Sequence, residues 1–212
     1  MPPAVTWLIR HGQSASNAGL PATGHGGEVP LTELGRRQVR EVAERVQRQP
    51  DLLIVSSFLR ALATAEPIRA RWPLTCCETW PIQELTYLSP ERCRGTTAEQ
   101  RRPWVAEYWR RCDPDYCDGP DAESFRSFIA RLRDFHERLL ALDGDFVVAV
   151  GHGQFFRAYL FGQTEGFAVA AEWMQAYRIA EIARPMANCE IIEVTGEALA
   201  RCRTCSNYSA TR

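Results

Sequence analysis

Short apolar runs alternate with amphipathic segments along most of the chain. Apolar runs bounded by polar residues or turns are typical of buried strands, and they occur at Leu52–Val55 and Phe146–Val150. A first strand is expected at about Val5–Arg10, where Val5, Trp7, Leu8 and Ile9 lead into Arg10. Between them, apolar residues recur every three or four positions, as over Phe125–Leu139, which predicts amphipathic helices. The alternation predicts an α/β fold, a three-layer α/β/α sandwich with a mainly parallel central sheet.

The remaining elements follow from the same periodicities. Thr32 is expected to cap a helix whose apolar positions include Val39, Val42 and Val46. Further helices are expected at about Leu59–Arg71, Thr97–Arg111, Glu123–Leu142, Phe155–Phe161 and Phe167–Tyr177. Further strands are expected at about Leu74–Glu78, Cys189–Val194 and Leu199–Cys202.

The segment from about 83 to 120 is irregular. Arginine, tryptophan, proline and cysteine are crowded together there. We interpret it as a helical cap inserted over the active-site edge of the sheet. No repeat or flexible linker divides the chain, so a single domain over residues 1–212 is expected.

Composition excludes several classes of function. The net charge of −1 gives no electrostatic reason to expect nucleic-acid or membrane binding. All 25 basic residues are arginines, which excludes lysine chemistry such as Schiff bases or a Walker-type phosphate loop. The N-terminus lacks a signal-peptide pattern, and no stretch approaches the ~18 apolar residues of a membrane span. We therefore expect a cytoplasmic protein, either a monomer or a homodimer.

The eight cysteines are scattered and do not suggest a disulfide framework. Cys202 and Cys205 form a CxxC motif. No second CxxC or CxxH completes a set of four zinc ligands. We therefore predict no metal site and no cofactor.

Two histidines stand at the ends of predicted strands. Arg10 and His11 directly follow the first apolar run, and His152 directly follows the run at 146–150. The carboxyl ends of parallel strands meet at one edge of a sheet, where α/β proteins place their active sites. An arginine beside one histidine favours an anion with several oxygens, most often phosphate, because the planar guanidinium can donate to two oxygens at once.

Several further polar motifs follow in a fixed order. Together they resemble the histidine phosphatase superfamily, the phosphoglycerate-mutase-like proteins. The matching segments are Arg10-His11-Gly12-Gln13-Ser14 with Asn17, Leu31-Thr32-Glu33-Leu34-Gly35 with Gln38, Ser57 and Leu59-Arg60-Ala61 with Thr64-Ala65, Glu84-Leu85, and Gly151-His152-Gly153. The resemblance extends from about Val5 to Phe161 and implies that family's fold and phosphoryl-transfer chemistry.

The resemblance, together with the residue types, implies a role for each residue. His11 would be the nucleophile that forms a phosphohistidine, with its other ring nitrogen held by a carbonyl such as that of Gly12. The phosphate would be bound by Arg10, Asn17, Arg60, His152 and the backbone N–H of Gly153. Glu84 would donate a proton to the leaving oxygen and later take one from water. Two arginines and an imidazole would supply the positive charge that a magnesium ion supplies in metal-dependent phosphoryl-transfer enzymes.

Hydrolysis of a small phosphorylated metabolite is the favoured activity, and two alternatives stay open. Trp109-Arg110-Arg111 resembles a segment of cofactor-dependent phosphoglycerate mutases, but the proline run of those mutases is missing. Thr86-Tyr87-Leu88-Ser89 also departs from the mutase pattern after Glu84. Mutase-type phosphoryl transfer is therefore one alternative. The other is a weakly catalytic regulatory module that binds phosphorylated ligands.

The cap holds six arginines and three aromatic residues of undecided role. We expect most of the arginines to lie on solvated helix faces, although one or two lining the pocket would favour a substrate with a second anionic group. They are Arg92, Arg94, Arg101, Arg102, Arg110 and Arg111. The aromatic residues Trp104, Tyr108 and Trp109 are expected in the core, with a stacking platform for a base or sugar as the alternative.

Overall fold

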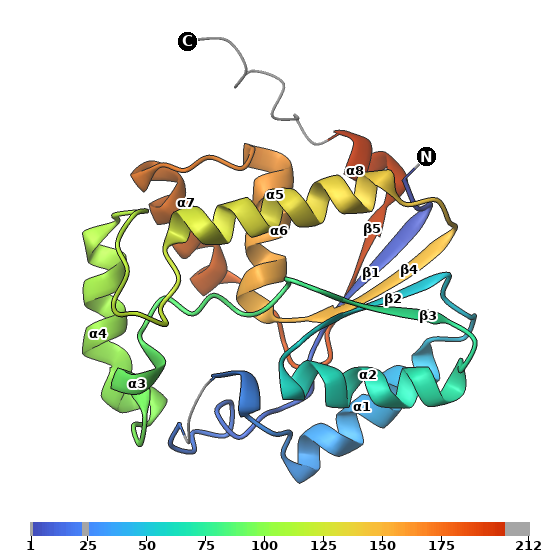
Figure 1. Cartoon of the computed structure of the whole chain (residues 1–212), viewed down its shortest axis with the longest axis horizontal. Coiled ribbons are helices and arrows are strands. Elements are labelled where there is room, and N and C mark those ends of the chain that lie inside the picture. The colour runs from blue at the N-terminus through green and yellow to red at the C-terminus, as the bar shows by residue number, and fades with distance from the viewer. Residues whose placement is uncertain (1, 23–25, 202–212) are drawn as a thin grey trace.

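The computed structural model describes residues 2–22 and 26–201. Its centre is a five-stranded sheet with the strand order β3-β2-β4-β1-β5 (Figure 1). The strands are β1 (Val5–Arg10), β2 (Leu52–Ser56), β3 (Cys76–Trp80), β4 (Phe146–Gly151) and β5 (Ile191–Thr195). Four strands are parallel, and β5 pairs antiparallel with β1. The predicted, mainly parallel sheet is confirmed.

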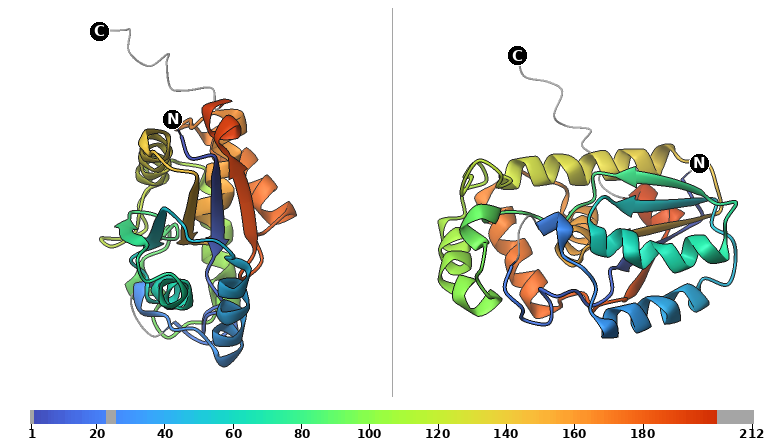
Figure 2. Two further views of the ribbon diagram at one scale, coloured as in Figure 1. Left: turned by 90° about the vertical axis from the view of Figure 1, so that its right-hand side faces the viewer. Right: turned by 60° about the horizontal axis from the view of Figure 1, so that its bottom comes forward.

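The two faces of the sheet bury different cores because successive side chains of a strand point to opposite sides. Leu53 and Val55 of β2 belong to the core under α1 (Glu33–Arg45) and α2 (Leu59–Arg71). Leu52 and Ile54 belong to the larger core on the other face. The helices there are α5 (Phe125–Ala141), α6 (Gly153–Glu165), α7 (Ala171–Ala183) and α8 (Gly196–Arg201). The three predicted layers are therefore present (Figures 1 and 2).

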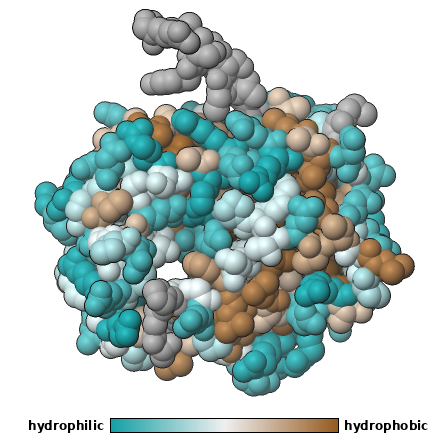
Figure 3. Space-filling model, in the orientation of Figure 1, coloured by the Kyte–Doolittle hydropathy of each residue, from teal (hydrophilic) through white to brown (hydrophobic). Residues whose placement is uncertain are grey.

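The cap consists of the short helix α3 (Pro90–Cys93) and helix α4 (Ala98–Arg111), which lie beyond the carboxyl ends of the strands (Figures 1 and 2). A capping box of Thr97 and Gln100 begins α4. The first loop, which includes the short helix η1 (Gly26–Glu28), is tied to the cap. The N–H of Ala22 donates to the Thr96 carbonyl at 2.9 Å, and the Gly95 N–H donates to the Ala22 carbonyl at 2.7 Å. A hollow remains between cap and body (Figure 3).

Local predictions differ from the structure mainly near the C-terminus. The strand expected at Leu199–Cys202 is instead helix α8 within the described residues. The reason is that Glu197, Ala198 and Leu199 are good helix formers, and Leu199 is buried in the α5 core. The Thr195 hydroxyl also accepts a hydrogen bond from the Ala198 N–H at 3.3 Å, in the first turn.

Other predicted elements occur with shifted ends. Strands β3 and β5 lie about two residues further along the chain than expected, and α7 begins at Ala171 rather than Phe167. Thr32 caps α1 as predicted, since its hydroxyl accepts from the Gly35 N–H at 3.0 Å. The CxxC motif of Cys202 and Cys205 lies outside the described residues. Over residues 2–22 and 26–201, no helix is long and apolar enough to cross a membrane.

Candidate active site

The candidate site lies where β1, β2 and β4 end. Arg10 and His11 come at the end of β1, Ser56 ends β2, and His152 follows β4. The rings of His11 and His152 have centroids 5.1 Å apart. Both histidines are almost fully buried. The structure therefore brings the two predicted strand ends together, as the topology required.

Hydrogen bonds fix the protonation form of His11. Its Nδ1 lies 2.7 Å from the Gly12 carbonyl oxygen, which can only accept, so the proton is on Nδ1. Nε2 therefore carries the lone pair, and it accepts a hydrogen bond from Arg60 Nε at 3.0 Å. Burial, and next the positive charge of Arg60, lower the pKa of His11 to about 3. The ring is thus neutral at physiological pH, and the predicted contact with the Gly12 carbonyl is confirmed.

Close packing around Gly12 holds this loop in place. A Cβ atom at Gly12 would lie 2.8 Å from Val39 Cγ1 and 2.9 Å from the Gly35 carbonyl oxygen, both on α1. The Gly12 N–H donates to Thr64 Oγ1 at 3.1 Å, and that hydroxyl donates to the Arg60 carbonyl at 2.6 Å. Helices α1 and α2 therefore both fix the backbone that positions His11.

Arg10 and Arg60 approach the site from different elements. Arg60, in the first turn of α2, is buried, and its Nη1 donates to the Gly26 carbonyl at 2.5 Å. Arg10 donates through Nη1 to the Met186 carbonyl and lies against Gly153, where a Cβ would be 3.2 Å from Arg10 Nε. Burial lowers the pKa of Arg60 to about 10, against the opposing effect of the Glu84 carboxylate. Both guanidinium groups stay charged at neutral pH.

His152 is the N-cap residue of α6, and Gly153 is the first residue of that helix. The His152 Nε2 is 2.9 Å from Ser56 Oγ. Burial lowers the pKa of His152 well below its ordinary value, with a further contribution from Arg60. Among the described residues, the buried atoms His152 Nδ1 and Arg10 Nε have no hydrogen-bond partner. Two buried nitrogens, one from the end of β1 and one directly after β4, are therefore left without a partner in the described part of the chain.

Glu84 faces the start of α6. One carboxylate oxygen accepts from the Phe155 N–H at 3.2 Å and from the Leu85 N–H at 3.3 Å, and the other accepts from the Gln154 N–H at 3.4 Å. Burial raises the pKa of Glu84, while Arg60 and Arg10 oppose the shift. A carboxyl group with a raised pKa next to two arginines is suited to exchanging a proton with a reacting group.

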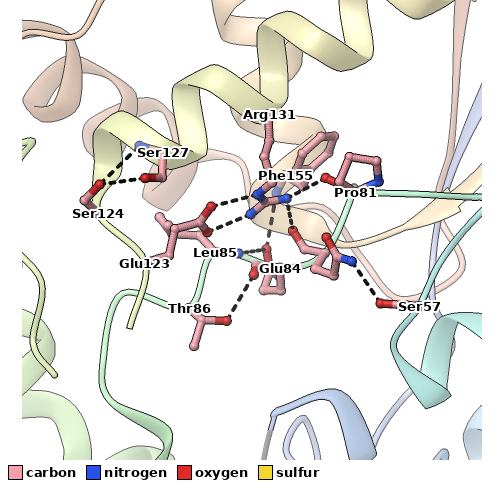
Figure 4. A network of polar contacts seen from close by, with 11 residues as sticks. Ser57, Pro81, Glu84, Leu85, Thr86, Glu123, Ser124, Ser127, Arg131 and Phe155 are labelled. Atoms are coloured by element: carbon pink, nitrogen blue, oxygen red, sulfur yellow. Dashed lines mark hydrogen bonds and ion pairs between the residues drawn. The ribbon is translucent and has the colours of Figure 1, made fainter. Parts of the chain in front are cut away.

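Arg131 of α5 holds the segment that carries Glu84 (Figure 4). Its Nε and Nη2 donate to the two carboxylate oxygens of Glu123, each at 2.7 Å. Its Nη1 donates to the carbonyls of Pro81 and Gln83 at 2.8 and 3.0 Å. One guanidinium therefore joins α5, the chain just after the cap segment and the chain directly before Glu84. We call this set of contacts the Arg131 clamp.

We expect Arg131→Met to lower the free energy of unfolding by roughly 2–3 kcal/mol, because charged hydrogen bonds are lost and Glu123 stays partly buried. It should also displace Glu84, because the carbonyls of Pro81 and Gln83 lose the donor that holds them, and so lower the activity of this site. Arg133→Met is the matched control, since Arg133 lies on the same helix and donates to the Phe167 carbonyl away from the site. Thermal unfolding and single-turnover rates separate the two effects. Equal activity losses in both variants would show that the Arg131 clamp contributes to stability only and does not position Glu84.

The loop before β5 contributes contacts that the sequence analysis missed. Asn188 Nδ2 donates at 3.0 Å to the His11 carbonyl and to Asn17 Oδ1. Met186 accepts from Arg10 through its carbonyl oxygen. One signal was present in the sequence: residues just before an antiparallel strand beside β1 must lie opposite residues just after β1. Asn17 itself is exposed, and its Oδ1 also accepts from Ser14, so it joins two loops beside the site.

A cavity of about 310 Å³, which we call the cap cavity, opens from Arg60 and Glu84 toward the cap. Of the six cap arginines, Arg101 lines it. Tyr108 and Trp109 are buried in the core, which confirms the core interpretation for both. Trp104 is partly buried against the core, with the guanidinium carbon of Arg92 4.4 Å from its ring centroid.

The model of the histidine phosphatase superfamily (branch 1) matches residues 6–191. The chain belongs to the histidine phosphatase superfamily. A protein named probable phosphoglycerate mutase GpmB, from Yersinia pestis, is 31% identical over 154 residues, which cover 69% of this chain and 68% of that protein. The resemblance drawn from the motifs is therefore confirmed.

Solved structures of this superfamily share the fold. The native structure of a mycobacterial glucosyl-3-phosphoglycerate phosphatase has a TM-score of 0.65 and 26% identity, over 90% of this chain and 89% of that chain. The structure of a putative alpha-ribazole-5'-P phosphatase from Escherichia coli has a TM-score of 0.68 over 90% of this chain and 89% of that chain, and its 19% identity shows the fold alone. These comparisons support a phosphatase or phosphotransferase of the histidine phosphatase superfamily.

Proposed function

We propose that the protein is a metal-independent phosphomonoester hydrolase that acts on a small phosphorylated metabolite through a phosphohistidine. The observation that carries this proposal is the form of His11. Its ring is neutral, its Nδ1–H donates to the Gly12 carbonyl, and its Nε2 lone pair accepts from Arg60. Two arginines supply positive charge for the phosphate oxygens, which is the main requirement of phosphoryl transfer.

The reaction has two steps. In the first, the His11 Nε2 lone pair attacks phosphorus, the bond from phosphorus to the leaving oxygen breaks, and Glu84 gives that oxygen its proton. Before this attack, Arg60 turns its N–H from Nε2 to the phosphate oxygens, which frees the Nε2 lone pair. In the second, water attacks phosphorus while the Glu84 carboxylate takes a water proton, and the bond from phosphorus to Nε2 breaks. Phosphate leaves, and His11 and Glu84 return to their starting forms.

Positioning of the phosphate depends on groups that already surround His11. Arg10 and Arg60 can each grip oxygens through two N–H groups. His152 and the Gly153 N–H at the start of α6 provide further donors. Asn17 is assigned a further contact with the substrate. Its loop is held by Ser14, whose N–H and hydroxyl donate to Asn17 Oδ1. These are the assignments that substitution must test.

Phosphoglycerate-mutase activity is the second candidate, because the Yersinia pestis relative carries that name. A mutase returns the phosphoryl group to a substrate oxygen, whereas a phosphatase gives it to water. The deciding test incubates the protein with p-nitrophenyl phosphate in EDTA and measures released phosphate. In parallel, 3-phosphoglycerate is supplied and 2-phosphoglycerate is measured. Phosphate release that resists EDTA supports the proposal. Mutase product without phosphate release overturns it, and binding without turnover supports a regulatory module instead.

Arg60→Ala and Arg10→Ala should each reduce kcat/KM by the equivalent of about 2–4 kcal/mol, because a charge-assisted contact with the phosphate is lost. Arg69→Ala is the control for Arg60, since Arg69 lies on the same helix and pairs with Glu66 at the surface. Steady-state kinetics with p-nitrophenyl phosphate give the comparison. An unchanged kcat/KM for either site variant would place that arginine outside the phosphate site.

A further inference from the structure

The cap cavity differs in character from the phosphate site that it adjoins. Arg60 and Glu84 form its inner wall. Mostly apolar side chains form the rest, among them Val29, Phe58, Leu85, Leu88, Cys93 and Val105. Its volume of about 310 Å³ is at the small end of the range for ligand pockets. The cavity thus connects Arg60 and Glu84 with a space under the cap whose wall is mostly apolar apart from Arg101.

A second cavity of about 500 Å³, the polar groove, lies on the other side of Glu84. Its wall shares Phe58, Glu84 and Thr86 with the cap cavity but does not include Arg60. Polar and charged side chains predominate in the remainder, namely Gln83, Asp121, Glu123, Ser124, Ser127 and Arg131. The group attached to the leaving oxygen has to extend from Arg60 past Glu84. Because the cap cavity is lined by both residues, it is the better placed of the two.

We propose that the substrates are phosphomonoesters of mainly apolar alcohols, whose carbon body lies in the cap cavity. This inference rests on the proposed function and names its substrate class. Apolar surface moved from water into the cavity is stabilised in proportion to its area. Hydroxyl groups placed against Leu85, Leu88 and Val105 would lose hydrogen bonds to water without gaining partners from those side chains.

Arg101 is the reason to consider a second class of substrate, one that carries a further negative charge. It is the second cation of the cavity wall, and its Nη1 donates to the Thr96 carbonyl at 2.6 Å and to the Thr96 hydroxyl at 3.2 Å. Arg101 favours a substrate with a second anionic group, so a leaving group with a carboxylate, as in 3-phosphoglycerate, is the alternative occupant of this cavity. We place it second because Arg101 Nη1 already donates to Thr96 and most of the wall is apolar. A sugar or polyol is the alternative occupant of the polar groove.

Binding of n-alkylphosphonates with two to six carbons tests the proposal without turnover. Isothermal titration calorimetry on the full chain should show affinity rising about three- to fourfold for each added methylene, until the cavity is filled. 2,3-Dihydroxypropylphosphonate is the polar partner of butylphosphonate and should bind more weakly. Affinity that stays flat with chain length, or tighter binding of the dihydroxy compound, overturns the proposal.

Two variants on α4 locate the effect in the cavity wall. Val105→Gln should flatten the dependence of affinity on chain length, because an amide replaces apolar wall. Ala106→Gln is the matched control, since Ala106 is exposed and does not line the cavity. Thermal unfolding verifies that both variants fold. A chain-length dependence in Val105→Gln equal to that of wild type overturns the placement of the carbon body in the cap cavity, and with it the proposal.

Turnover then separates the substrate class from the proposed function. Phosphate release is measured from n-butyl phosphate, glycerol 3-phosphate, 3-phosphoglycerate and p-nitrophenyl phosphate. We expect a higher kcat/KM for n-butyl phosphate than for the two polar metabolites. Faster hydrolysis of 3-phosphoglycerate overturns the apolar class while leaving the hydrolase intact. Phosphonate binding that rises with chain length, without hydrolysis of any ester, overturns the hydrolase and leaves the apolar ligand class standing.

Discussion

His11→Ala is expected to abolish turnover, with a loss of at least roughly 10⁴-fold, because no other group can take the place of its Nε2 lone pair. The ring is buried, but its hydrogen bonds are to Gly12 and Arg60 within the site. The variant should therefore fold. Wild-type protein incubated with ³²P-labelled substrate should carry an acid-labile, alkali-stable label, and the variant should carry none.

His136→Ala is the control for this experiment. His136 is also buried, but its Nδ1 contacts Tyr159 Oη at 3.1 Å in the core between α5 and α6. Its replacement should lower stability and leave the label in place. Ordinary hydrolysis by His11→Ala, or a label that survives in it, would end the phosphohistidine mechanism.

Glu84→Gln should have the second-largest effect, and the effect should depend on the leaving group. A general acid typically contributes ~10²–10⁴-fold. The first step should therefore slow strongly with alkyl phosphates. It should change little with p-nitrophenyl phosphate, whose phenolate leaves without a proton. Single-turnover measurements isolate this step from dephosphorylation, which should slow for both substrates because Glu84 also acts as the base toward water.

The pH dependence of the first step gives an independent check. General acid catalysis needs protonated Glu84, and burial raises the pKa of that group. The rate with an alkyl phosphate should thus fall as pH rises through this raised pKa. In Glu84→Gln, this fall should be absent from the pH–rate profile. Attack also needs neutral His11, which is protonated only near pH 3 or below. Equal slowing of the first step for both leaving groups would remove Glu84 as the acid.

Much of the fold follows from local pattern. The strands β2 and β4 are nearly continuous apolar runs because both of their faces are covered, whereas β1 includes Thr6 and Arg10 and is only partly buried at Val5 and Trp7. Helix α5 shows the three-or-four spacing of a helix with one buried side. Leu199 shows where this fails. A single apolar position gives no period that separates a strand from a helix over so few residues. The helix propensities of Glu197 and Ala198 and the packing of Leu199 against α5 decided the outcome.

The candidate site divides in the same way. His11, Arg60 and His152 stand at element ends, so strand order alone brings them together. Asn188 and Arg131 reach the site only through the antiparallel placement of β5 and the rotation of α5 about its axis. Neither is visible in local spacing, because each depends on contacts between segments far apart in the sequence.

The pairing of β1 has a consequence for synthesis on the ribosome. Val5 pairs with Phe146 of β4, and Ile9 pairs with Ile191 of β5. At typical translation rates, the nascent strand that carries His11 waits on the order of ten seconds for its partners to emerge. During that interval Trp7, Leu8 and Ile9 are exposed to chaperones and to neighbouring chains. Production at lower temperature or with added chaperone should therefore raise the yield of active protein.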